Sequence, residues 1–128
     1  MLKRIFLGGA LFWTGFILYL CLIRASNLPS VTIPYIDKCV HFVFHFVFSI
    51  LWFLVLDFYF KNQRRNKLLG IVFLMSLCFG IAIELFQTFF TVTRNGDVID
   101  VFANSTGSLL AILILDFLDK MVEKNNLK

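Results

Sequence analysis

Three stretches of this sequence carry ionisable and amide side chains at intervals of three or four residues. Such intervals place side chains on one face of a helix. The three sets are Asp37, Lys38, His41 and His45; Glu84, Gln87 and Thr91; and Asp97, Asp100 and Asn104. A histidine, carboxylates and amides gathered in this way can transfer protons, bind a polar ligand or hold a metal ion.

Two kinds of site residue follow from these types. His41 paired with Glu84 or Asp100 is a candidate general acid–base pair, so these three are the candidate catalytic residues. The candidate ligand-binding residues are Asp37, Lys38, Gln87, Arg94, Asp97 and Asn104. Lys38 and Arg94 suit a phosphate or carboxylate, and the amides suit neutral groups such as sugar hydroxyls.

A metal site and structural roles are the alternatives for the same residues. One imidazole and several carboxylates could hold a divalent ion, but their spacing matches no zinc motif, so the sequence predicts no metal and no cofactor. Glu84 could instead hydrogen-bond Asn104 or pair with Arg94, and Asp97 or Asp100 could cap a helix. His45 lies deeper in its helix and favours packing.

The composition identifies the elements that must position these residues. The chain has 128 residues, of which 59% are hydrophobic, 17% aromatic and 16% charged, with a mean hydropathy of +0.85. A soluble domain is about 45–50% apolar and about 25% charged. The same composition excludes an intrinsically disordered chain and a disulfide-stapled secreted domain. The three cysteines show no pairing pattern. The chain is therefore predicted to be an integral membrane protein.

Four stretches reach the length of about 20 apolar residues that a transmembrane helix needs. They are 5–23, 39–60, 68–90 and 98–118, which predicts an all-α, compact bundle of four transmembrane helices in one domain, 1–128. The first stretch is interpreted as an uncleaved helix rather than a signal peptide, since no small-x-small site follows it. Gly8 and Gly15, seven residues apart, predict close packing of this helix.

The basic residues predict the orientation. Nine of the twelve lysines and arginines lie at the two termini and in the 61–67 loop. By the positive-inside rule the N- and C-termini are cytoplasmic, in the bacterial cytoplasmic membrane, and the 61–67 loop is a topology determinant near anionic lipids. The three polar faces then share the outer half of the bilayer. Because a charge at mid-membrane costs on the order of 2.5–3.5 kcal/mol, their common depth predicts a polar pocket that opens outward.

Two blocks of the sequence resemble the signatures of the VanZ-like membrane protein family. They are Pro34-x-x-Asp37-Lys38-x-x-His41-Phe42, and Glu84-x-x-Gln87 followed by Arg94-x-x-Asp97-x-x-Asp100-x-x-x-Asn104-x-x-Gly107. The resemblance implies a small polytopic membrane protein with functional residues at the outer surface. The family takes its name from an accessory protein of glycopeptide resistance, associated with reduced sensitivity to teicoplanin. The resemblance implies no settled reaction. It suggests a link to glycopeptide resistance without assigning that resistance to this chain.

Three functional hypotheses remain open. The leading one is a pocket that binds the head group of a membrane lipid or a lipid-linked cell-envelope precursor. The second is an acid–base or metal-assisted enzyme that acts on such a molecule. In the third, the polar faces serve structure, or dock a membrane-protein partner or a second copy. The net charge of +4 reflects topology, so no nucleic acid is expected as a partner.

Overall fold

The computed structural model describes residues 1–23, 35–91 and 96–126, and these residues form four helices and no strand. The helices are α1 (Leu2–Leu22), α2 (Ile36–Tyr59), α3 (Arg65–Phe90) and α4 (Val98–Asn126). The all-α class is confirmed for these residues, and each of the four helices is long and apolar enough to cross a membrane. The first three helices begin three residues earlier than predicted, because helical structure continues into polar residues beyond the apolar run.

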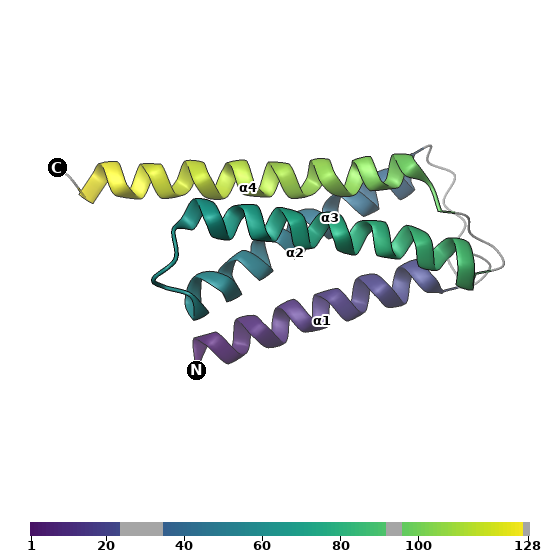
Figure 1. The fold of residues 1–128 in the computed structure, drawn as a ribbon, viewed down its shortest axis with the longest axis horizontal. Helices are drawn as coiled ribbons and strands as arrows, with labels where there is room; N and C mark the ends of the chain where they lie inside the picture. The colour runs from purple at the N-terminus through teal and green to yellow at the C-terminus, as the bar shows by residue number, and fades with distance from the viewer. Residues whose placement is uncertain (24–34, 92–95, 127–128) are drawn as a thin grey trace.

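Consecutive helices run antiparallel, so the start of α1 and the end of α4 lie at one end of the bundle (Figure 1). The opposite end, where α2 and α4 begin, is called the site end below. α2 and α3 each pack against all the other helices, whereas α1 and α4 do not contact each other within the described ranges. Which end faces the cytoplasm stays a prediction.

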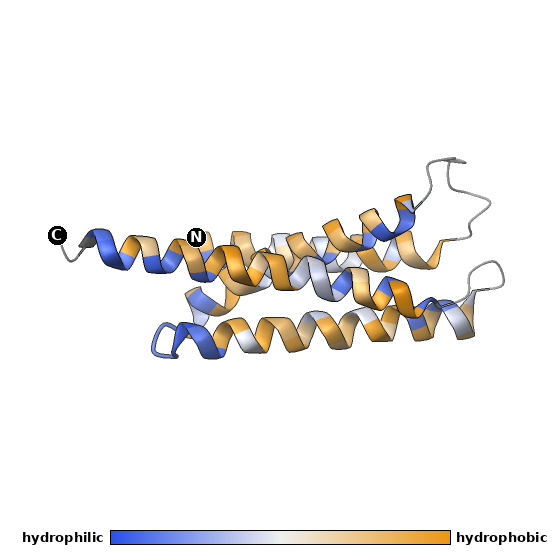
Figure 2. Cartoon of the chain, turned by 90° about the horizontal axis from the view of Figure 1, so that it is seen from above, coloured by the Kyte–Doolittle hydropathy of each residue, from blue (hydrophilic) through white to orange (hydrophobic). Residues whose placement is uncertain are grey.

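The interior of this bundle contains many polar side chains, and its surface is rich in hydrophobic ones. The buried side chains include nine polar ones, which are His41, His45, Ser49, Ser76, Glu84, Gln87, Asp100, Asn104 and Ser108. Many large hydrophobic side chains are exposed along the helices, and hydrophilic residues are most frequent toward the ends of the bundle (Figure 2). A hydrocarbon surrounding explains both observations, because apolar side chains lose nothing by facing lipid.

Helix α1 is fastened to α2 by two tryptophans. The indole N–H of Trp13 donates to the Phe44 carbonyl oxygen at 3.0 Å, and that of Trp52 donates to the Thr14 hydroxyl at 3.1 Å. The prediction that glycines pack α1 closely is wrong, because a Cβ at Gly8 or Gly15 would meet no atom within 4 Å. Both glycines lie on the exposed side of α1, and its buried face is formed by Ala10, Ile17 and Cys21.

Glycines on the polar faces do bring helices together. A Cβ at Gly107 of α4 would overlap the Phe42 carbonyl oxygen of α2, so the two backbones are in contact there. A Cβ at Gly80 of α3 would lie 2.9 Å from Asn104 Nδ2. Both approaches hold α2, α3 and α4 close beneath the site end, which allows short polar side chains to meet across the helices.

The end opposite the site end is joined by Arg65. Its Nε lies 2.9 Å from Asp119 Oδ2 of α4 and its Nη1 lies 3.5 Å from Asp57 Oδ1 of α2. The guanidinium also lies over the Phe53 ring, 5.0 Å from its centroid. Arg65, the first residue of α3, therefore connects α3 to α2 and α4.

Candidate functional site

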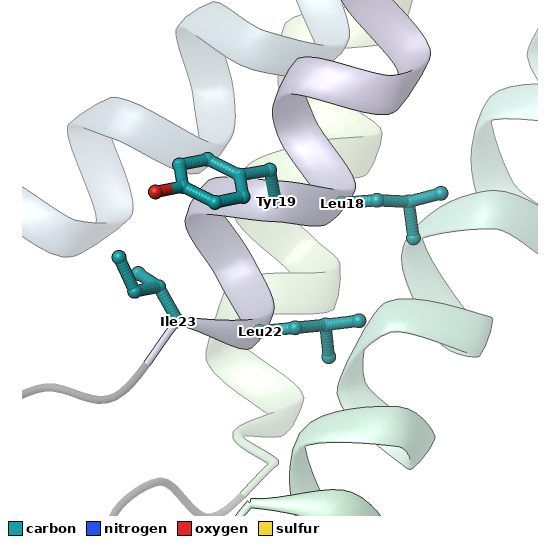
Figure 3. A pocket seen from close by; sticks show the side chains of 4 residues that line it. All are labelled: Leu18, Tyr19, Leu22 and Ile23. Atoms are coloured by element: carbon teal, nitrogen blue, oxygen red, sulfur yellow. The ribbon is translucent and has the colours of Figure 1, made fainter.

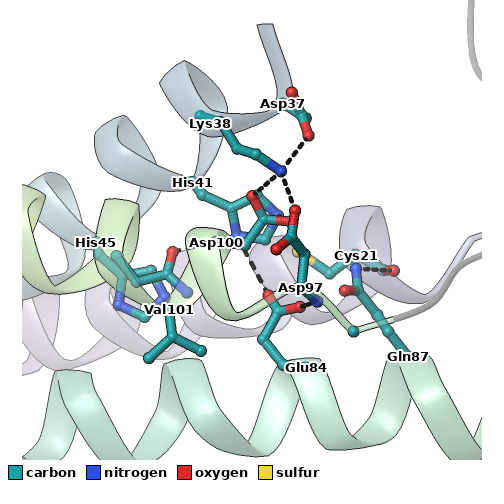
Figure 4. A network of polar contacts seen from close by, with 12 residues as sticks. Cys21, Asp37, Lys38, His41, His45, Glu84, Gln87, Asp97, Asp100 and Val101 are labelled. Carbon is teal, nitrogen blue, oxygen red and sulfur yellow. Dashed lines mark hydrogen bonds and ion pairs between the residues drawn. The ribbon is translucent and has the colours of Figure 1, made fainter. Parts of the chain in front are cut away.

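Lys38 is the centre of charge at the site end (Figure 4). Its Nζ lies 2.7 Å from Asp37 Oδ2, 2.6 Å from Asp97 Oδ2 and 2.7 Å from Asp100 Oδ1. Lys38 lies in the first turn of α2, whereas Asp97 and Asp100 lie on either side of the start of α4. One ammonium group therefore joins the two helices, and it is shared by three carboxylates rather than free for another anion.

Asp97 has a second role at the start of α4. Its Oδ1 accepts a hydrogen bond from the Ile99 backbone N–H at 2.9 Å, which is the geometry of a helix N-cap. The predicted capping role is thus confirmed for Asp97. The hydrogen bond from Lys38, together with the one from Ile99, lowers the pKa of the Asp97 carboxyl from its ordinary value of 3.8.

His41 lies one turn below Lys38, between two carboxylates from different helices. Its Nδ1 is 3.8 Å from Glu84 Oε1 of α3, and its Nε2 is 3.8 Å from Asp100 Oδ2 of α4. Nδ1 also lies 3.1 Å from Asn104 Oδ1, close enough for a hydrogen bond. The three candidate catalytic residues therefore come together as predicted, and all three are buried.

Glu84 of α3 is hydrogen-bonded to the backbone of Asp97, the residue that precedes α4. Its Oε2 accepts a hydrogen bond from the Asp97 backbone N–H at 2.9 Å. Its Oε1 is buried and has no hydrogen-bond partner among the described residues. The alternative of a Glu84–Asn104 hydrogen bond is wrong, because Asn104 is turned toward His41. The other alternative, a pair with Arg94, lies outside the described residues.

The remaining predicted site residues are spread around this centre. Asp37 is exposed and pairs with Lys38. Gln87 is buried and donates from Nε2 to the Cys21 carbonyl oxygen of α1 at 2.9 Å, on the side of the cluster away from His45 (Figure 4). Arg94 is not among the described residues. The polar cluster is defined here as Asp37, Lys38, His41, Glu84, Asp97, Asp100 and Asn104.

Two further hydrogen bonds continue below the polar cluster and were not predicted. His45 Nδ1 lies 2.7 Å from Ser76 Oγ of α3, and Ser49 donates to the Ser108 hydroxyl of α4 at 2.7 Å. Ser49 lies four residues after His45, and Ser108 four residues after Asn104. Continuing each polar face by four residues would therefore have identified both serines.

The polar cluster carries an excess of negative charge. It contains four carboxyl groups and one ammonium group, which gives a formal charge of −3 for its residues when all four carboxyl groups are ionised and His41 is neutral. The groups that could hold a metal are His41, Glu84 and Asp100, whose ligand atoms all lie within 4.8 Å of one another. Asp97 is not one of them, because its carboxylate pairs with Lys38 and accepts the Ile99 N–H at the start of α4.

An apolar pocket lies at the end of α1, toward the site end of the bundle. It has a volume of about 550 Å³ and is lined by Leu18, Tyr19, Leu22 and Ile23 (Figure 3). Cys21, whose carbonyl accepts the Gln87 hydrogen bond, lies in the same turn of α1. The apolar pocket therefore lies at the same end of the bundle as the polar cluster.

A family model described as VanZ/LLP1 matches residues 6–119 of the chain. The matched segment contains every residue of the polar cluster and nearly all of the four helices. Neither the curated proteins nor the solved structures contain a match to the sequence.

Proposed function

The chain belongs to the VanZ/LLP1 family, and we propose that its polar cluster binds the head group of a lipid or lipid-linked cell-envelope molecule. The four apolar helices and the family together indicate a multi-pass membrane protein. The proposal adds that the membrane is the bacterial cytoplasmic one and that the site end opens at its outer leaflet.

The basic residues support this orientation. Nine of the twelve lysines and arginines belong to the chain termini and the 61–67 loop, the end opposite the site end (Figure 1). A fluorescent protein fused after Lys128 should therefore fluoresce in cells, and an export-dependent phosphatase fused there should be inactive. The same phosphatase fused to a chain cut after residue 30 should be active. Phosphatase activity at the C-terminus would reverse the orientation.

The observation that carries the binding proposal is the gradient of exposure through the polar cluster. The side chain of Asp37 is 57% exposed, that of Lys38 20% and that of Glu84 8%. Charged groups drawn from three helices thus lead from the bundle surface into its interior. Because such groups are costly inside a membrane, they are retained there mainly where they are used.

The contacts of the polar cluster favour a head group that donates hydrogen bonds and carries a phosphate. Carboxylate oxygens of Glu84 and Asp100 accept from hydroxyl, amine or amide groups. Lys38 is already shared by three carboxylates, so a phosphate needs a further cation. Arg94 is the candidate that the sequence offers. The apolar pocket at Leu18 and Leu22 suits the first carbons of the lipid chain.

Short-chain lipids that differ only in their head group test this proposal. The purified chain in detergent is titrated with dihexanoyl lipids bearing phosphate, phosphoethanolamine or phosphoglycerol, and with a neutral diacylglycerol. We expect a saturable rise in the unfolding temperature with at least one phosphate-bearing lipid and none with the neutral lipid. Glu84→Gln, which keeps an acceptor for the Asp97 N–H, should weaken that binding at least tenfold.

Thr106→Ala is the matched control, because the Thr106 hydroxyl bonds only to carbonyls of its own helix. It should leave the lipid titration unchanged. Lipid retained through purification, measured by native mass spectrometry, should fall in Glu84→Gln and not in Thr106→Ala. Equal retention in both variants, or no response to any of the lipids, would refute head-group binding.

The position of His41 between two carboxylates also favours the second hypothesis, a membrane-embedded enzyme. An imidazole within 3.8 Å of both groups can relay a proton once a substrate closes these distances. Turnover of a bound lipid in liposomes, lost in Glu84→Gln with normal folded yield, would favour the enzyme. Loss of folded yield alone would favour the structural hypothesis. The link to glycopeptide resistance stays a prediction of the family resemblance.

A further inference from the structure

Glu84 has a buried carboxylate oxygen with no hydrogen-bond partner among the described residues. The residue is only 6% exposed, and its Oε1 has no hydrogen-bond partner in the described part of the chain. His41 Nδ1 lies 3.8 Å away, beyond hydrogen-bond distance. A buried acceptor without a donor is destabilising, and a charged one more so. A cation bound beside Oε1 would remove that cost.

His41 is oriented as metal-binding histidines usually are. In the tautomer that donates from Nδ1 to Asn104 Oδ1, 3.1 Å away, Nε2 keeps its lone pair. Such a second hydrogen bond commonly fixes the ring of a metal ligand. Nε2 lies 3.8 Å from Asp100 Oδ2. This distance is too long for a hydrogen bond, but two ligands of one metal ion can be this far apart.

The two carboxylate oxygens of Asp100 would each contact a different cation, which are the Lys38 ammonium group and the bound metal ion. Its Oδ1 pairs with Lys38 Nζ at 2.7 Å, and its Oδ2 faces His41. The ligand atoms of His41, Glu84 and Asp100 lie within 4.8 Å of one another. Tetrahedral ligands at about 2.1 Å from a Zn²⁺ ion are about 3.4 Å apart. To coordinate one ion at Nε2, the three side chains would therefore move closer together, with the Glu84 carboxylate turning from Nδ1 toward Nε2.

From these contacts we propose that His41, Glu84 and Asp100 bind one divalent transition-metal ion, Zn²⁺ or Mn²⁺, and that this ion receives the phosphate of the head group. An imidazole beside two carboxylates favours these ions over Mg²⁺ and Ca²⁺, which prefer oxygen ligands alone. Three protein ligands leave a coordination position open. Only the contact with phosphate rests on the proposed function, whereas metal binding stands on the three residues themselves.

The charge of the polar cluster agrees with this inference. A formal charge of −3 repels phosphate, and a dication reduces it to −1 while adding a direct phosphate ligand. The competing arrangement is a protonated His41 that pairs with both carboxylates and needs no metal. The two arrangements differ in an observable way, since only the first binds a metal ion from solution.

Metal binding is tested on the full chain in detergent after treatment with a chelator. Zn²⁺, Mn²⁺, Mg²⁺ and Ca²⁺ are added separately, and the unfolding temperature and the bound metal per chain are measured. We expect one equivalent of Zn²⁺ or Mn²⁺ with a saturable rise in unfolding temperature, and no response to Mg²⁺ or Ca²⁺. Co²⁺ in place of zinc should give visible absorption bands that report its ligands.

Substitutions locate the ion. Glu84→Gln and Asp100→Asn should each weaken the metal at least tenfold and change the Co²⁺ bands. Asp116→Asn removes the same charge near the opposite end, where Asp116 pairs with Lys120 at 2.6 Å, and should bind metal normally. Wild-type chain that binds no equivalent of any of these metals, or Glu84→Gln with wild-type affinity, would overturn the proposal.

The metal and the head group can fail separately. If short-chain phospholipids bind equally with and without chelator, the metal inference is wrong and the proposed function stands. If the ion binds at His41, Glu84 and Asp100 but no lipid binds in its presence, the metal site stands and head-group binding is wrong.

Discussion

Replacing Lys38 with methionine should lower the free energy of unfolding by about 2–3 kcal/mol at neutral pH. The substitution removes the only ammonium group that contacts Asp37, Asp97 and Asp100 in the described structure, whose oxygens lie 2.6–2.7 Å from it. Methionine keeps the length of the side chain, so the loss is one of charge. Three carboxylates are then left facing one another, two of them partly buried.

The effect of Lys38→Met should depend on pH in a defined direction. In the wild type, Lys38 lowers the pKa of Asp97 below its ordinary value of 3.8, so the stability from this pair is full at neutral pH and is lost as the pH falls below that value. In the variant, protonation of the carboxylates relieves their repulsion. The difference between the two unfolding temperatures should therefore shrink as the pH falls from 7 to 3.

Lys120→Met is the matched control for Lys38→Met. Lys120 also pairs with an aspartate at 2.6 Å, but its side chain is 71% exposed, and such an exposed pair contributes little to stability. Thermal unfolding in detergent, followed by circular dichroism, measures both variants. Equal unfolding temperatures for the two, or a difference that does not change with pH, would contradict the central role assigned to Lys38.

Gly107→Ala should be the most damaging single-methyl change in the bundle. The new Cβ would overlap the Phe42 carbonyl oxygen of α2, and backbone cannot turn aside as a side chain can. Overpacking of this kind typically costs about 1–3 kcal/mol and occasionally more. The separation of α2 and α4 also sets the distance between Lys38 and Asp100, so binding at the polar cluster should weaken together with stability.

Gly15→Ala provides the comparison on a helix of similar composition. A Cβ at Gly15 would meet nothing within 4 Å, and alanine is a better helix former than glycine by up to about 1 kcal/mol. Its unfolding temperature should equal or exceed that of the wild type, while that of Gly107→Ala falls. If both variants unfold alike, α2 and α4 are not held at backbone contact.

The sequence was sufficient for the helices and for the faces that meet. An apolar run long enough to cross a membrane forms a helix, because the helix satisfies its backbone hydrogen bonds internally. Residues three and four apart then lie on one face of that helix. His41, Glu84, Asp100 and Asn104 were therefore expected to lie together, and they do.

The individual side-chain contacts within the polar cluster could not be predicted in the same way. Helical periodicity gives the direction of a side chain but not the height of one helix relative to the next. Lys38 was assigned to an external anion and instead contacts three carboxylates, because the register of α2 against α4 is set by Gly107 and Phe42. Glycine spacing on α1 suggested close packing, yet it does not say which face of a helix is buried.

The exposed hydrophobic surface of the bundle has a consequence for how such a chain can diverge. Leucine, isoleucine, valine and phenylalanine are interchangeable where they face hydrocarbon, so most positions can drift without penalty. Selection is then concentrated on a few inward positions, such as Gly80, Gly107 and the polar cluster. We therefore expect related chains to vary at the lipid-facing positions and to keep those inward ones.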